Sequence, residues 1–135
     1  MSKTAASASV AKSAGDCVSC VLQAVACLGG LLLIVGSRGG PRIITSTSEV
    51  ILNVLDYGMT LAEAMSAPRL HHQALPDTLY IERGGVTPAV ADSLRAMGYN
   101  VGWSRGIGLV NAVMRVQGGY EGMSDPRSSG QPVGY

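Results

Sequence analysis

The sequence lacks phenylalanine and has few other aromatic residues, with one Trp and five Tyr among its 135 residues. A core built on packed aromatic rings is therefore excluded. The hydrophobic residues, 47% of the chain, must form an aliphatic core instead. This content suffices for one domain of ordinary size and excludes disorder throughout the chain.

Lysine is nearly missing as well, since Lys3 and Lys12 are the only two, and the arginines are scattered along the sequence. Ten basic and nine acidic residues give a net charge of +1. Proteins that bind nucleic acids or anionic membranes usually carry a clear excess of positive charge. The composition therefore indicates neither of these partners.

Three cysteines, Cys17, Cys20 and Cys27, are too few for a disulfide scaffold. Cys17 and Cys20 form a C-x-x-C pair, which is typical of redox sites and of half a zinc site. A zinc site needs a second ligand pair, and the only histidines are the adjacent His71 and His72. No βαβ pattern surrounds the pair, as a thioredoxin-like site would require. We interpret the cysteines as small apolar residues and expect no metal and no cofactor.

The first 30 residues differ in composition from the rest of the chain. Residues 1–16 are small and polar, whereas residues 17–36 are apolar with polar and glycine interruptions. We expect residues 1–30 to be an atypical leader, flexible or non-native, because their Ala, Ser, Cys and Val bias fits DNA translated in the wrong frame. The alternative is a membrane-anchored interaction module in which residues 17–36 are the anchor.

From residue 31 on, hydrophobic periodicity and capping residues predict the order β-α-α-β-α-β-β, a mixed α/β (α+β) fold. Ser46 and Glu49 have the spacing of a capping box, which would start the first helix a turn after Pro41. The segments PRLHHQALPD and GGYEG and the C-terminal tail are expected to be loop, turn and irregular chain. We expect strands at 31–35, 78–83, 99–105 and 109–117, and helices at 41–57, 60–67 and 87–97.

The stretch GSRGGPRII at residues 36–44 places two glycines between the first strand and the first helix. Pro41 suits the start of a helix. It is also expected to hold Gly40 in an extended conformation, because proline restricts the residue before it. Two interpretations are open: a tight turn and nothing more, or backbone that approaches a ligand, which glycine allows because it has no Cβ.

Three motifs follow one another in the sequence: the turn GSRGGPRI, the block APRLHHQALPD, and the closing segment EGMSDPRSSG that leads to a final GY. In this order and spacing they resemble the C-terminal part of the small subunit of γ-glutamyltranspeptidases, also called glutathione hydrolases. The resemblance extends over residues 31–135, whereas the leader resembles nothing in that family.

The resemblance implies a partial αββα sandwich of the N-terminal nucleophile hydrolase type. Enzymes of that family transfer the γ-glutamyl group of glutathione to water or to an acceptor amine, without a metal or cofactor. It also implies that the backbone amides of Gly39 and Gly40 form the oxyanion hole. Arg38 stands where the family usually has Pro, and Pro41 stands where it usually has Ser. These departures change the surroundings of both amides.

The family's nucleophile is an N-terminal Thr in a TTHxSVVD-like stretch, which the sequence does not contain. The family's Ser-Ser pair before the strand at 31–35 is missing too, and Thr4 and Thr45 lack the required setting. We therefore predict a fragment without a nucleophile, inactive by itself. The alternatives are a subunit that restores γ-glutamyl transfer with separate large-subunit and N-terminal small-subunit portions, or self-association. Localisation stays open, although relatives are commonly exported or membrane-tethered.

Two further polar motifs predict structure rather than catalysis. Neighbouring residues of a strand point to opposite faces, so His71 and His72 are unsuited to holding one metal ion together. Glu63 follows Thr60 at the spacing of a capping box, which explains its position at the start of a helix.

The remaining charged residues predict ion pairs. Arg69 is expected to pair with Asp77 or with Asp125. The sequence Asp125-Pro126-Arg127 is expected to form a turn with a salt bridge, which by resemblance belongs to the closing segment of the family fold.

Overall fold

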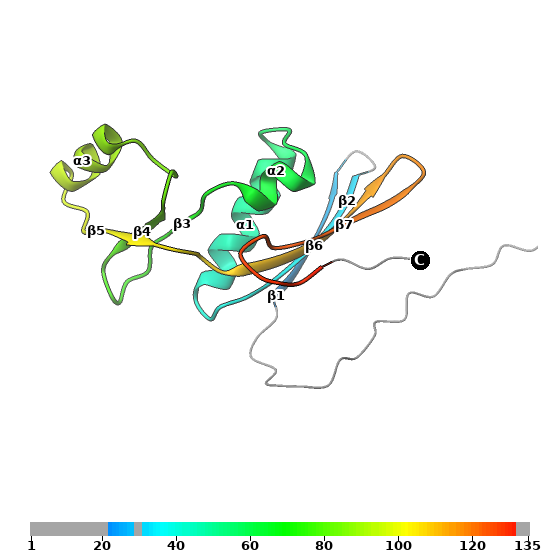
Figure 1. The fold of residues 1–135 in the computed structure, drawn as a ribbon, viewed down its shortest axis with the longest axis horizontal. Coiled ribbons are helices and arrows are strands. Elements are labelled where there is room, and N and C mark those ends of the chain that lie inside the picture. Colours follow the sequence, from blue (N-terminus) through cyan, green and yellow to red (C-terminus); the bar gives the residue numbers. More distant parts are fainter. Residues whose placement is uncertain (1–21, 29–30, 132–135) are drawn as a thin grey trace, which may run out of the picture.

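The computed structural model describes residues 22–28 and 31–131, so the predictions for Thr4, Cys17 and Cys20 lie outside the described residues. Seven strands and three helices make up the described part of the chain (Figure 1). In chain order they are β1 (Leu22–Leu28), β2 (Leu31–Arg38), α1 (Arg42–Leu55), α2 (Leu61–Ser66), β3 (Leu70–His71), β4 (Leu79–Glu82), α3 (Pro88–Ala96), β5 (Val101–Ser104), β6 (Leu109–Val116) and β7 (Gly119–Ser124).

The strands form two sheets. The larger sheet has the order β1-β2-β6-β7 and is antiparallel throughout. The smaller sheet has the order β3-β4-β5, with β3 and β4 antiparallel and β4 and β5 parallel. Helices α1 and α2 lie against the larger sheet, and α3 lies beside the smaller one at the other end of the molecule (Figure 1). The mixed α/β class predicted from the sequence is confirmed.

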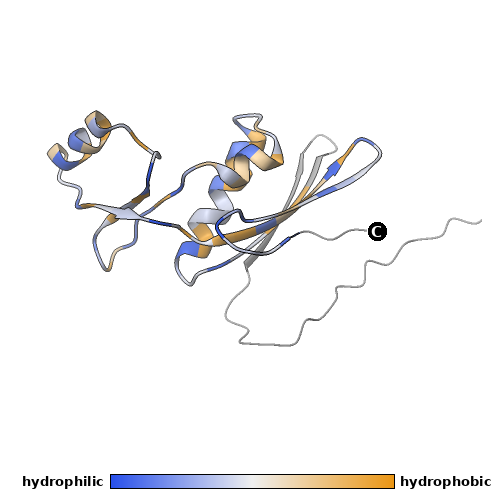
Figure 2. Ribbon diagram, in the orientation of Figure 1, coloured by the Kyte–Doolittle hydropathy of each residue, from blue (hydrophilic) through white to orange (hydrophobic). Residues whose placement is uncertain are grey.

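The main core lies between the larger sheet and helices α1 and α2. Leu33 and Val35 of β2 are fully buried and alternate with the exposed Ile34, as expected for a strand with one covered face. Figure 2 shows the hydrophobic positions of α1, α2 and β6 where these elements meet. The buried residues of this core are Leu33, Val35, Val50, Val54, Leu61, Ala64, Met65, Val110 and Ala112. All are aliphatic or Met, as the lack of aromatic residues predicts.

The opposite face of the larger sheet is also partly apolar. Ile34 of β2 pairs directly with Val113 of β6. Their side chains are 39% and 42% exposed, on the face away from α1 and α2. These two paired β-branched side chains leave an apolar spot between the two central strands of the sheet.

Helix α1 begins at Arg42, with Pro41 as its N-cap residue, so the later start predicted from a capping box is wrong. Both side chains of that expected box find partners inside the fold instead. The Ser46 hydroxyl donates to the carbonyl oxygen of Arg42 at 2.8 Å. Glu49 Oε1 accepts the backbone amide of Leu70 at 3.0 Å, and burial raises the pKa of this carboxyl group.

Helices α2 and α3 begin as the sequence predicts. Thr60 and Glu63 form a capping box, in which the Thr60 amide donates to Glu63 Oε2 at 2.9 Å and the Glu63 amide donates to Thr60 Oγ1 at 3.3 Å. Thr87 caps α3 through the amide of Val90, and Pro88 occupies the first helical position. These local predictions are confirmed.

Three strands differ from the sequence predictions. Strand β7 occupies the region expected to be a turn and irregular chain, because its backbone pairs with β6 from Asn111↔Ser124 to Val116↔Gly119. Strand β3 is a two-residue strand inside the expected loop. Strand β1 lies within the predicted leader and pairs with β2 along its length. Within the described residues no helix is long and apolar enough to cross a membrane.

Candidate functional site

The glycine turn between β2 and α1 has a backbone that only glycine adopts easily. The φ angles are +134° at Gly39 and +61° at Gly40, both in the left-handed region. The expectation that Pro41 holds Gly40 extended is therefore wrong. The restriction before proline depends largely on the Cβ of the preceding residue, and glycine has none.

The turn leaves two backbone amides exposed. Its carbonyl groups are used by the helix, since Gly39 O accepts the Arg42 amide at 3.4 Å and Gly40 O accepts the Ile43 amide at 3.1 Å. Neither the Gly39 amide nor the Gly40 amide donates to an acceptor among the described residues. Both precede the N-terminus of α1, where the partial charge of the helix is positive. The turn is thus suited to binding a negatively charged oxygen.

A cavity of about 790 Å³ opens beside this turn. The residues that line it are Arg38, Gly39, Gly40, Arg42, Arg105, Gly106, Gly108, Leu109 and Arg127. Among these described residues there is no hydroxyl, thiol, imidazole or carboxyl side chain. The cavity can therefore stabilise negative charge, but its described lining supplies no nucleophile and no general base.

The segment that joins β5 to β6 forms one wall of the cavity and lies against the turn. A Cβ placed on Gly39 would be 3.4 Å from the Cα of Gly108. Gly108 itself has a φ of +66°, and a Cβ there would be 2.4 Å from Ser46 Oγ. Ser46 is held in turn by Ser37 of β2, whose hydroxyl oxygen is 3.0 Å away. The small residues at these positions thus allow the segment between β5 and β6 to lie close to the glycine turn and to the first turns of α1. These residues are Ser37, Gly39, Ser46 and Gly108.

Replacing Gly108 with Ala is expected to lower the free energy of unfolding by about 2–5 kcal/mol. Left-handed backbone costs a non-glycine residue about 1–2 kcal/mol, and overpacking adds about 1–3 kcal/mol. Urea denaturation measures this change. Gly118→Ala is the matched control, because Gly118 has a φ of +88° and no atom within 4 Å of its Cβ position. Equal losses in the two variants would contradict the close contact with Ser46.

A buried ion pair lies behind this wall. Arg69 Nη1 is 2.7 Å from Asp125 Oδ2, and both side chains are almost completely buried. Arg69 Nη1 also donates to the carbonyl oxygen of Ile107 at 3.1 Å, and Asp125 Oδ2 accepts the Val110 amide at 2.8 Å. Of the two partners predicted for Arg69, Asp125 is therefore confirmed.

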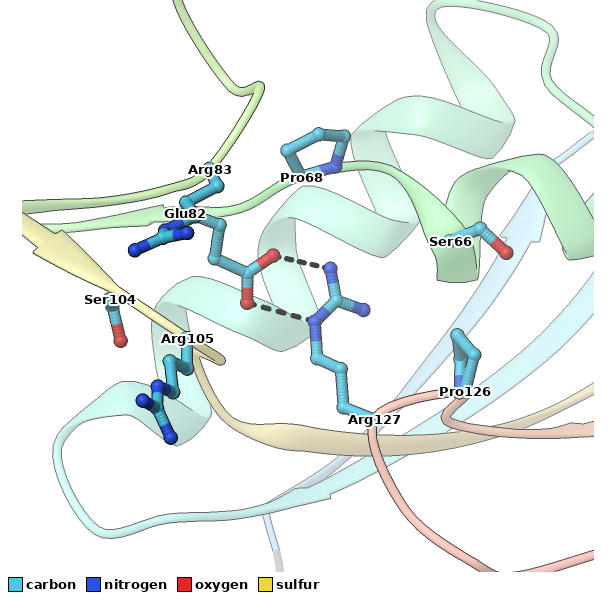
Figure 3. A pocket seen from close by; sticks show the side chains of 8 residues that line it. All are labelled: Ser66, Pro68, Glu82, Arg83, Ser104, Arg105, Pro126 and Arg127. Carbon is cyan, nitrogen blue, oxygen red and sulfur yellow. Dashed lines mark hydrogen bonds and ion pairs between the residues drawn. The ribbon is translucent and has the colours of Figure 1, made fainter.

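A second pair completes the network, as Figure 3 shows: the guanidinium group of Arg127 faces the carboxylate of Glu82. Arg127 Nε donates to Glu82 Oε1 at 2.8 Å, and Arg127 also pairs with Asp125 Oδ1 at 3.2 Å. Glu82 Oε1 accepts the amide of Ile107 as well. The predicted turn with a salt bridge at Asp125-Pro126-Arg127 is confirmed. Arg69 binds the carbonyl oxygen of Ile107 and Glu82 binds its amide, so both pairs hold this residue. Ile107 lies between Gly106 and Gly108 of the cavity wall.

Contacts within this network shift the pKa values of Asp125 and Arg127. Burial alone would raise the pKa of Asp125, but hydrogen bonds from the amides of Val110 and Arg127 and from Arg69 hold it below its usual value. Burial alone would lower the pKa of Arg127, but Glu82 and Asp125 raise it. Both shifts favour the charged forms of Asp125 and Arg127, as expected for members of a network of ion pairs.

The two histidines are separated by the fold, as predicted. His71 is buried, with Nδ1 2.9 Å from Thr45 Oγ1 and Nε2 2.8 Å from Gln73 Oε1. His72 is exposed, and its Nε2 is 2.8 Å from Asp77 Oδ1. Neither histidine lines the cavity, and His71 joins β3 to α1. Within the described ranges, no group of three His, Cys, Asp or Glu side chains is arranged to hold a metal ion.

Two parts of the site were missed in the sequence: Glu82, which joins the network, and the wall formed by Gly106 and Gly108. Glu82 lies within the strand predicted at 78–83, and nothing in its sequence neighbourhood indicates partners distant in the sequence. The alternating glycines of RGIGL between two predicted strands were the available signal, because such glycines often mark close backbone approach.

Comparison with known proteins places these features in a family. Residues 17–135 match the family model described as gamma-glutamyltranspeptidase. The glutathione hydrolase proenzyme of Escherichia coli (strain K12) is 43% identical over 101 residues, which are 74% of this chain and 17% of that protein. The proenzyme of the same name from Pseudomonas aeruginosa is 42% identical over 108 residues, 76% of this chain and 19% of that protein. The chain thus spans less than a fifth of the length of these relatives.

Solved structures agree in fold. A γ-glutamyltranspeptidase of Helicobacter pylori matches with a TM-score of 0.74 and 41% identity, over 82% of this chain and 62% of that chain. One from Pseudomonas nitroreducens matches with a TM-score of 0.75 and 35% identity, over 87% and 63% of the two chains. These neighbours confirm the predicted partial sandwich of the N-terminal nucleophile hydrolase type. The boundary at residue 31 stays a prediction, although the family match and β1 both begin before it. From its motifs, its fold and these matches, the chain belongs to the γ-glutamyltranspeptidase family.

Proposed function

We propose that this chain supplies the oxyanion-binding turn of a γ-glutamyltransferase or glutathione hydrolase site. The observation that carries the proposal is that Gly39 and Gly40 line a cavity and that their amides have no acceptor among the described residues. The names of the relatives supply the substrate class, a γ-glutamyl donor such as glutathione.

The chemistry follows from the charge that develops during acyl transfer. When a nucleophilic oxygen attacks the γ-carbonyl carbon, the carbonyl oxygen becomes an oxyanion. The amides of Gly39 and Gly40 donate hydrogen bonds to that oxyanion, and the positive end of α1 adds to their effect. Because the turn is already folded, the donors do not have to reorganise during the reaction. Removal of one such donor typically costs about 10²–10³ in rate.

The nucleophile, in this proposal, comes from a segment outside the cavity lining. The described lining offers arginines, glycines and one leucine, and none of these attacks a carbonyl group. We infer that the chain by itself does not turn over a γ-glutamyl substrate. Its partners are the large-subunit portion and the N-terminal small-subunit portion of the family. The exposed pair Ile34 and Val113 supports a further layer on the sheet. Self-association is the alternative.

The test is hydrolysis of γ-glutamyl-p-nitroanilide by two samples. One sample is the purified chain. In the other, the chain is co-expressed with the part of the Escherichia coli relative that it does not match. We call this second sample the complemented pair. We expect turnover only in the complemented pair, with circular dichroism showing that the first sample is folded. Turnover by the folded chain alone would contradict the assignment of the nucleophile to another segment.

A further inference from the structure

The cavity beside the glycine turn has an unusual charge. Four arginines line it, Arg38, Arg42, Arg105 and Arg127, and no acidic side chain does. Guanidinium groups around one cavity repel one another unless anions offset their charges. The question is therefore which of these four charges are already offset within the fold.

Two of the four arginines are engaged. Arg127 is neutralised by Glu82 and Asp125 and also donates to the carbonyl oxygens of Met65 and Ala67 at 2.9 and 2.8 Å. Arg42 donates to the carbonyl oxygen of Gly106 at 3.4 Å, and its guanidinium carbon lies 5.3 Å from the centre of the Tyr80 ring. Arg42 has no carboxylate partner among the described residues, but a cation–π contact and one hydrogen bond fix its position.

The other two, Arg38 and Arg105, are exposed and have no carboxylate within salt-bridge distance in the described part of the chain. Arg38 ends β2 directly before Gly39, and Arg105 follows β5 directly before Gly106. Figure 3 shows the Arg105 side chain apart from the Glu82–Arg127 pair, with no interaction drawn to it. Both charges therefore border the cavity without an offsetting partner among these residues.

We propose that Arg38 and Arg105 form an anion-binding subsite beside the turn, which takes the side-chain carboxylate of an acidic peptide. Guanidinium groups bind carboxylates in a two-pronged geometry that a neutral amide cannot reproduce. The assignment of this peptide as the acceptor of the γ-glutamyl group rests on the proposed function. The anion-binding property itself does not. Arg38, which replaces the usual proline of the family turn, is thus a residue that determines specificity.

The test compares two dipeptides that differ by one charge, glycyl-L-glutamate and glycyl-L-glutamine. Each is titrated into the purified chain at low salt, and binding is followed by ¹⁵N–¹H NMR. We expect glycylglutamate to bind more tightly and its affinity to fall between 20 mM and 500 mM NaCl, because the screening length shortens. Arg38→Gln and Arg105→Gln are each expected to weaken it by about 3- to 10-fold, in line with a partly exposed charge-assisted hydrogen bond.

The matched control is Arg115→Gln, which removes an exposed arginine of β6 outside the cavity lining and should leave both affinities unchanged. Equal affinities for the two dipeptides, or an unchanged affinity in the Arg38→Gln/Arg105→Gln double variant, would overturn the proposal. Inorganic phosphate that binds more tightly than glycylglutamate would overturn the carboxylate assignment.

A second readout uses γ-glutamyl transfer by the complemented pair. The KM for glycylglutamine as acceptor, divided by the KM for glycylglutamate, should be above one and should fall toward one in the double variant. The NMR titration involves no turnover, so it separates this proposal from the proposed function. Normal titration without any γ-glutamyl transfer would count against the proposed function alone. Normal transfer without preference for glycylglutamate would count against the subsite alone.

Discussion

Gly39→Pro lowers kcat of the complemented pair for γ-glutamyl-p-nitroanilide by about 10²–10³, if Gly39 donates to the oxyanion as proposed. Proline has no amide hydrogen, so one of the two donors is lost. The fixed φ of proline near −65° also conflicts with the +134° of Gly39, which misplaces the second donor at Gly40. Because the loss occurs in the transition state, kcat should fall much more than KM changes.

The matched control is Gly58→Pro. Gly58 also has a left-handed φ, of +64°, and no atom lies within 4 Å of its Cβ position. It follows α1 and does not line the cavity. A similar loss of kcat in both variants would show that backbone strain, and not the missing donor, explains the effect. A Gly39→Pro variant with full activity would remove Gly39 from the catalytic machinery.

Asp125→Ala is expected to lower the free energy of unfolding by about 3–5 kcal/mol, because breaking one side of a buried ion pair leaves the other charge uncompensated. The variant would leave Arg69 buried without its carboxylate partner and would also remove the acceptor of the Val110 amide. Domains of this size have only about 5–15 kcal/mol of total stability, so the loss should be visible in urea or thermal denaturation.

The comparison variant is Asp92→Ala, which removes an exposed ion pair with Arg95 on α3 and should change stability little. Asp125→Ala with an equally small effect would contradict the role given to the network.

In the native chain, the pKa of Asp125 is held low. The contribution of its charge to stability is therefore complete above the unfolded pKa of about 4. That contribution is lost as the pH falls through the folded pKa, and Asp125→Asn should remove this part of the acid sensitivity.

Local features were the ones that the sequence allowed us to predict. The starts of α2 and α3 depend on residues three positions apart, Thr60 with Glu63 and Thr87 with Val90. Such contacts need only residues that are close in the sequence, so their spacing is a usable signal. The glycine turn was likewise visible, because a Gly-Gly pair before Pro41 is a local signal.

Features that depend on distant partners were predicted poorly. The short strand β3 and the glycine-containing strand β7 form because β4 and β6 offer backbone hydrogen bonds to them, and their own residues give little sign of it. Glu82 meets Arg127 across 45 positions of sequence. The start of α1 was misplaced for a similar reason, since Ser46 and Glu49 bond to tertiary partners instead of capping the helix.

The candidate site combines both kinds of feature. Its donors are local, whereas its wall is positioned by Arg69, Glu82, Asp125 and Arg127 from three different parts of the chain. The network binds the backbone of Ile107, and the neighbouring Gly108 lies against Gly39 of the turn. We therefore expect changes that weaken the network to affect the geometry of the turn as well as stability.

The most direct test of the oxyanion assignment is a ¹⁵N–¹H NMR spectrum of the complemented pair with a boronic acid analogue of the γ-glutamyl group. Such an analogue forms a tetrahedral, negatively charged adduct with a hydroxyl nucleophile. We predict that the amide protons of Gly39 and Gly40 shift downfield and exchange more slowly with solvent, while that of Gly58 stays unchanged. Unchanged Gly39 and Gly40 signals in a fully inhibited sample would contradict the assignment of these amides as the oxyanion hole.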